Sequence, residues 1–126
     1  RLSEDFERAA EFHRQALSVF RRARYPRGEA SALGNLGNLY HELGDCRRAV
    51  DYYEQELVVA RAAEQLTNIG RVLINLGAAH WQLGERVAAL ARVEEACATL
   101  ERSGDSEVET ARRLLAEWRD APEPDA

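Results

Sequence analysis

The chain has 126 residues, of which 45% are hydrophobic and 31% are charged, and its net charge is −5. These values are typical of one folded domain, and the acidic balance argues against direct nucleic-acid binding, which requires a basic face. No apolar run is long enough to cross a membrane, and two cysteines are too few for a disulfide framework, so we expect a cytoplasmic protein.

Residues 5–24 predict a leading helix that ends in an arginine-rich segment. The arginines gathered at this end are Arg21, Arg22, Arg24 and Arg27. Cations are favourable near the carboxyl end of a helix, where backbone carbonyls carry partial negative charge. An anion-binding patch is the alternative interpretation. The sequence YPRG, from Tyr25 to Gly28, predicts the turn that ends this helix.

A repeat of forty residues organises the chain. The stretch NLGNLYHELGD, from Asn35 to Asp45, returns as NLGAAHWQLGE, from Asn75 to Glu85. Because fixed periods of this size are the signature of repeat proteins, we expect one helical domain over residues 1–121. Its expected parts are the second half of a repeat at 5–24, full repeats at 30–64 and 70–103, a capping helix at 106–120 and then a frayed tail at 122–126.

Each full repeat predicts a pair of helices. Apolar residues recur at three- and four-residue spacing in the first helix of the first repeat, at Leu33, Leu36, Leu39, Tyr40 and Leu43. Gly44 can adopt the left-handed conformation that ends a helix, and Asp45 is a candidate cap for the return helix. Gly84 and Glu85 repeat this arrangement forty residues later.

A second glycine in each repeat, Gly37 or Gly77, lies inside the first helix. Glycine costs about 1 kcal/mol relative to alanine in a helix interior. We therefore expect close packing of the return helix against these glycines, with Ala49 and Ala89 as the small residues that they meet.

The end of the domain departs from the repeat. Ser106 and Glu109 have the spacing of a capping box, which predicts the start of a last helix. Arg113 occupies the position of Leu33 and Leu73 in the two repeats. We therefore expect this helix to cap the stack. Trp118 is expected to pack within that cap.

These residues resemble the tetratricopeptide repeat pattern, which runs from a large residue through leucine-glycine, tyrosine, alanine and an aromatic to a final alanine. The pattern positions are Leu33, Leu36, Gly37, Tyr40, Ala49, Tyr53 and Glu56, then Leu73, Leu76, Gly77, His80, Ala89, Val93 and Ala96. Glu56 departs from the expected alanine and Val93 from the expected aromatic, and no proline ends a repeat. The period of forty exceeds the usual 34 and resembles kinesin light chains, Pins-type scaffolds and regulatory ATPases of actinobacteria.

The resemblance implies an all-α fold, a right-handed superhelix of antiparallel helix pairs with about six helices. It also implies a concave groove, lined by the first helix of each pair, that binds a peptide or protein segment. The matching partner-binding positions are Asn35, Asn38, His41, Glu42, Arg71, Asn75, Trp81 and Gln82, together with Ser31 and Ala78.

Two of these residue types suit binding on chemical grounds. The amides of Asn35 and Asn75 each offer a donor and an acceptor to a ligand backbone, and asparagine is a mediocre helix former. Tryptophan is enriched among binding hot spots, so Trp81 is a further candidate. The alternatives are that both amides tie helices together and that Trp81 only packs.

Catalytic and metal-binding patterns are not found. His13, His41 and His80 share no spacing that would assemble a metal site. Cys97 falls at core positions of the repeat and Cys46 at a position expected to be partly exposed, and neither has an evident base. We therefore expect no catalytic residue, no metal, no cofactor and no enzyme activity.

The sequence favours a non-catalytic interaction scaffold, part of a larger regulatory or signalling protein that binds a protein or peptide ligand. The arginine-rich composition without lysine hints at a bacterial, GC-rich genome. The alternative is a self-association module, a possible homo-oligomer. It would use an open flank of the leading helix around Phe6, Phe12 and Leu17.

Overall fold

The computed structural model describes residues 2–124, and all of the regular structure in this range is helical. The helices are α1 (Leu2–Arg22), α2 (Pro26–Leu43), α3 (Cys46–Ala62), α4 (Leu66–Gln82), α5 (Arg86–Ser103) and α6 (Val108–Arg119). The expected all-α fold with six helices is confirmed.

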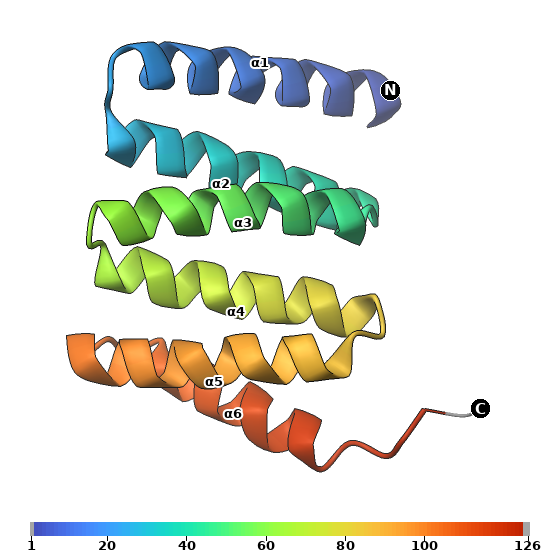
Figure 1. Ribbon diagram of the computed structural model, residues 1–126. Coiled ribbons are helices and arrows are strands. Elements are labelled where there is room, and N and C mark those ends of the chain that lie inside the picture. Colours follow the sequence, from blue (N-terminus) through green and yellow to red (C-terminus); the bar gives the residue numbers. More distant parts are fainter. Residues whose placement is uncertain (1, 125–126) are drawn as a thin grey trace.

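The helices form a stack in which each packs against its neighbours in the sequence. The main contacts join α1 to α2, α2 to α3, α3 to α4, α4 to α5 and α5 to α6. Figure 1 shows this order, from α1 at one end of the stack to α6 at the other. Packing between consecutive units alone is the property that defines a solenoid.

The two glycines expected to end helices adopt the left-handed conformation. Gly44 has φ of 92° at the end of α2, and Gly84 has φ of 80° just after α4. Asp45 caps α3 as expected, because its side chain accepts a hydrogen bond from the backbone N–H of Arg48 at 3.1 Å. Gly44 and Asp45 fix the tight turn of the first repeat. In the second repeat Gly84 ends the turn, and Glu85 forms no side-chain cap.

Two predicted boundaries are wrong. The sequence from Tyr25 to Gly28 is not a turn, because α2 already begins at Pro26, where the missing N–H of proline costs no hydrogen bond. The capping box of Ser106 and Glu109 does not form either. Asp105 takes its place and accepts a hydrogen bond from the backbone N–H of Glu107 at 2.8 Å.

The close approach at the helix-interior glycines is confirmed, with a different partner for Gly37. A Cβ at Gly37 would lie 2.5 Å from Cε1 of Tyr53, not against Ala49. A Cβ at Gly77 would lie 2.5 Å from Cγ2 of Val93 and 3.3 Å from the Ala89 carbonyl oxygen. The side chain one turn further along the return helix fills the space that each glycine leaves.

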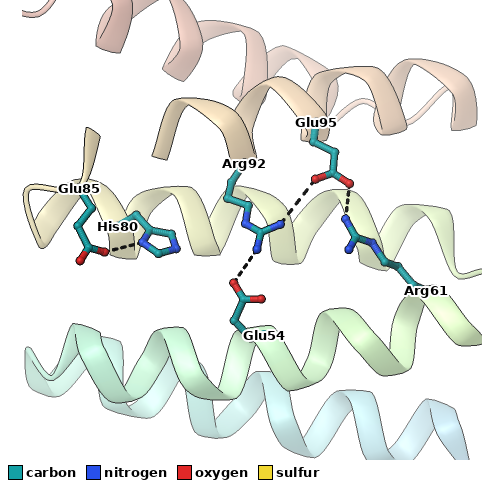
Figure 2. A network of polar contacts seen from close by, with 6 residues as sticks. All are labelled: Glu54, Arg61, His80, Glu85, Arg92 and Glu95. Carbon is teal, nitrogen blue, oxygen red and sulfur yellow. Dashed lines mark hydrogen bonds and ion pairs between the residues drawn. The ribbon is translucent and has the colours of Figure 1, made fainter. Parts of the chain in front are cut away.

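Ion pairs join the second helices of successive repeats (Figure 2). Arg92 on α5 donates to Glu54 on α3 at 2.8 Å, and Arg61 on α3 pairs with Glu95 on α5. Arg21 on α1 donates to Gln55 on α3 at 3.0 Å, which is the same contact shifted by forty residues. Because these side chains are partly exposed, their contacts add little to the stability of the fold. They mainly set the register between successive repeats.

The two ends of the stack differ. At one end α6 covers α4 and α5, and the Trp118 ring stacks on Trp81 at 4.8 Å, which confirms Trp118 as a packing residue of the cap. At the other end the flank of α1 is less open than expected, since Leu17 is buried and Phe6 packs edge-on against Tyr40. Phe12 remains exposed.

We predict that Gly37→Leu lowers the free energy of unfolding by about 1–3 kcal/mol, because the new side chain must displace the buried ring of Tyr53. Urea unfolding measures the change. Ala98→Leu, which enlarges an exposed position of α5, is the control and should leave stability nearly unchanged. Equal stability of the Gly37 variant and the wild type would refute the close-approach account.

Candidate functional site

A large hollow lies between the first helices of the two full repeats. It is a cavity of about 600 Å³ between α2 and α4, with α3 and the loop before α4 contributing to its floor and edge. We call it the groove. Its lining residues are Arg27, Ser31, Gly34, Asn35, Asn38, Glu56, Gln65, Leu66, Thr67, Asn68, Arg71 and Asn75.

The groove brings together five of the ten sequence-predicted binding positions, which are Ser31, Asn35, Asn38, Arg71 and Asn75. Asn35 on α2 and Asn75 on α4 are related by the forty-residue repeat, so two successive helices present the same amide to one hollow. With Asn68, all four asparagines of the chain line it. Neither the Asn35 side chain nor the Asn75 side chain forms a hydrogen bond with another described residue, so both amides are available to a ligand.

The other five predicted residues, which are His41, Glu42, Ala78, Trp81 and Gln82, are not among the groove's lining residues. Glu42 lines a separate hollow between α1 and α2, beside Phe6. Gln82 accepts a hydrogen bond from the Cys46 thiol at 2.9 Å. Cys46 itself is buried, whereas its position in the repeat led us to expect partial exposure.

The rings of Trp81 and His41 have partners within the chain. Trp81 lies between Trp118 and the guanidinium of Arg86, whose Cζ is 4.3 Å from the centre of the ring. His41 meets the edge of Tyr53, with ring centres 6.5 Å apart. Much of the Trp81 ring that the sequence suggested for contact with a partner is thus covered by α6.

Glu56 is a groove residue that the expected binding set does not include. Only 7% of it is exposed, and its Oε1 has no hydrogen-bond partner among the described residues. Its carboxylate lies over Gly34, where a Cβ would be 3.0 Å from either oxygen. The departure from the family pattern at this position, where alanine is expected, was the available sequence signal.

Burial dominates the ionisation of Glu56. Removal from water raises the pKa of its carboxyl to about 7, although the charge of Arg71 and the neighbouring amide of Asn68 both act to lower it. A buried carboxyl with a strongly raised pKa in a hollow is a recognised sign of a functional position.

A second polar contact orients the groove. The hydroxyl of Tyr53 donates a hydrogen bond to Oδ1 of Asn38 at 2.6 Å, which leaves the NH₂ group of that amide free to donate. Arg27 and Arg71 are exposed at the rim, and neither forms an ion pair with a described residue. The groove therefore offers donors at its rim and one buried acceptor at its floor.

The chemistry of the groove is that of binding through hydrogen bonds and charge. Among the described residues, no group of three histidine, cysteine, aspartate or glutamate side chains could hold a metal ion. Over the same residues, no helix combines the length and the apolar character that crossing a membrane requires.

We predict that Glu56→Gln makes stability less dependent on pH. The folded-state pKa of Glu56 is raised from 4.5 to about 7, so its contribution is fully present below the lower value and is lost as pH rises through the upper one. Relative to the variant, the free energy of unfolding of the wild type should fall by about 3 kcal/mol as pH rises across this window.

Urea unfolding at a series of pH values measures this difference. Glu7→Gln removes an exposed carboxylate of α1 and serves as the control, whose unfolding should follow the wild type. Parallel curves for the Glu56 variant and the wild type would contradict a buried carboxyl of raised pKa.

Comparisons with known proteins agree with this arrangement. The chain matches the family model described as tetratricopeptide repeat at residues 1–62 and 28–102. Among solved structures it is similar to BtubC (BKLC) from P. vanneervenii, with 18% sequence identity and a TM-score of 0.66. The match covers 98% of this chain and 62% of the BtubC chain. No curated protein sequence matches.

The family match spans most of the chain, and its repeat unit is the helix pair seen in the fold. Proteins of this family generally mediate interactions between proteins. The chain belongs to the tetratricopeptide repeat family.

Proposed function

We propose that the groove binds an extended peptide segment of a protein partner and that the chain has no catalytic role. The main support for this function is the pair of equivalent amides, Asn35 and Asn75. Both face one hollow, and neither has a side-chain partner among the described residues. An amide can donate to a backbone carbonyl and accept from a backbone N–H, so such a pair can hold a main chain whatever its side chains.

The rim supports the same function. Arg71 is the repeat equivalent of Ser31, and both line the groove beside the paired asparagines. Arg27 adds a second exposed guanidinium from the first turn of α2. Charged rim groups of this kind accelerate the encounter with a partner and help select it.

We further propose that the chain is part of a larger regulatory protein of the bacterial cytoplasm. Two observations support this. Cys46 and Cys97 are both free and buried, which suits a reducing compartment. BtubC, the similar structure, is longer than the region that this chain covers.

The function is tested with Asn35→Ala combined with Asn75→Ala. A library of random peptides is selected on the wild type, and the affinity of an enriched peptide is measured for both proteins. Because each lost hydrogen bond costs about 0.5–1.5 kcal/mol, we expect affinity to fall about tenfold or more.

Gln15→Ala on α1, an exposed amide outside the groove, is the control and should bind like the wild type. Circular dichroism verifies that the double variant keeps its helical content. Undiminished affinity of the folded double variant would refute a role for these amides.

A second candidate function, self-association, is favoured by the exposed apolar residues of α1. Phe12 is 67% exposed and Val19 is 57% exposed, one above the other on the helix. Their repeat equivalents on α3 are Tyr52 and Val59, which are half-buried, and Tyr52 stacks on Tyr40 at 5.6 Å. Helix α1 lacks a corresponding cover among the described residues.

If α1 pairs with a second copy, sedimentation equilibrium should show a dimer whose population rises with concentration. Phe12→Ser should shift the equilibrium to the monomer, because it removes the largest exposed ring of this helix. Val58→Ser, which changes an exposed apolar residue of α3, is the matched control. A wild type that stays monomeric at high concentration would exclude this function for the chain.

A further inference from the structure

Glu56 is not required by the fold. Its repeat equivalent is Ala96, which is completely buried in the second helix pair of the same chain. The two repeats also differ opposite this position, where the first has Gly34 and the second has Ile74. Small and large residues have thus changed places, and the carboxylate fits because Gly34 has no side chain.

The exchange places an acidic group where it is costly. The second repeat fills the equivalent space with apolar side chains, Ala96 and Ile74, whereas a desolvated carboxylate reduces stability unless it is paired. No ion pair to Glu56 is found within the described residues, and its Oε1 has no donor. The charge of Arg71 and the amide of Asn68 offset the cost of burial only in part, and groups that break the packing rules in this way are expected at functional sites.

The geometry also gives the carboxylate access to the groove. Glu56 belongs to α3 but lines the hollow between α2 and α4, because it reaches past Gly34. Arg71 and Asn68 on α4 are its polar neighbours, and Asn35 and Asn38 line the same hollow from α2. An acceptor therefore lies at the floor, below the amides that we assign to the peptide backbone.

We propose that Glu56 is the specificity-determining residue of the groove and receives a basic side chain, lysine or arginine, of the bound peptide. This inference rests on the proposed function, since it assigns one side-chain position of the same ligand. Lysine and arginine combine a long apolar stem with a terminal donor group, which suits an acceptor that is buried in the lining of the groove.

The arginines of the rim do not reverse this preference. Arg27 and Arg71 are exposed, so water and salt screen their repulsion of an entering cation. Glu56 is 7% exposed, and in such surroundings a charge pair is much stronger than at the surface. A cation that reaches the floor gains more from Glu56 than it loses at the rim.

The proposal is tested with the random peptide library, selected in parallel on the wild type, on Glu56→Ala and on Glu7→Gln. On the wild type and on Glu7→Gln we expect lysine or arginine to be enriched at one fixed position. On Glu56→Ala, which reproduces the residue found at position 96, this enrichment should disappear while the variant still selects peptides.

Affinities of one enriched peptide then measure the effect. Replacing its basic residue by norleucine should weaken binding to the wild type about tenfold and leave binding to Glu56→Ala unchanged. Binding to the wild type should also strengthen about tenfold between about pH 5.5 and about pH 8.5, as the Glu56 carboxyl loses its proton. Glu56→Gln, which keeps the shape of the side chain, should abolish this pH dependence.

The charged and titratable groups around Glu56 keep the pH test specific. Arg71 from α4 and Arg27 from α2 are the other charged groups that line the groove. Tyr53, on the same helix as Glu56, has a pKa raised by burial and stays neutral. A peptide without other groups that titrate in the range leaves Glu56 as the source of the change.

The outcomes separate this inference from the function on which it rests. If no peptide is enriched on the wild type, both are overturned. If peptides bind through Asn35 and Asn75 but show no basic position, or an acidic one, only the assignment of Glu56 is overturned. Binding that strengthens as pH falls would overturn it as well.

Discussion

The close contact between the two helices of each pair is the constraint on which the rest of the structure depends. At Gly37 and Gly77 the absence of a side chain lets Tyr53 and Val93 fill the interface completely. This contact fixes the rotation of α2 and α4 about their axes. The same rotation turns Asn35 and Asn75 to the opposite side, towards the groove. A loosened hairpin would therefore disturb the stability of the fold and the alignment of the two amides together.

Much of the fold could be predicted because the same residue pattern occurs twice in the sequence, forty residues apart. The helix-ending role of Gly44 and Gly84 follows from their residue type and their recurrence at forty residues. The ends of the second helices follow the same period but were harder to predict. Arg24, Glu64 and Gly104 all have positive φ, at 52°, 56° and 69°, and only the last is a glycine. At the other two positions backbone hydrogen bonds close the helix end, from the Tyr25 N–H to the Phe20 carbonyl and from the Gln65 N–H to the Ala60 carbonyl. The residue types of Arg24 and Glu64 do not reveal this conformation.

The candidate site could be predicted only in part, for a similar reason. Residues that face the groove along one helix, such as Asn35 and Asn75, follow from helical spacing and the repeat. Glu56 comes from another helix and reaches the groove because Gly34 leaves room, which depends on how three helices meet. Trp81 shows the converse, since the repeat pattern places it among the groove positions but it lies outside the groove, against the indole of Trp118. Contacts between side chains of different helices decided both cases.

The distribution of paired and unpaired charges separates the two sides of the stack. On the side of the second helices, Arg61 and Arg92 pair with Glu95 and Glu54, so charge there joins one repeat to the next (Figure 2). In the groove, Arg27 and Arg71 form no ion pair within the described chain, and Glu56 retains an acceptor without a donor. A fold selected only for stability would have little reason to keep unsatisfied groups on one side when it satisfies them on the other. The buried acceptor of Glu56, which has no donor among the described residues, lies where a ligand can supply one.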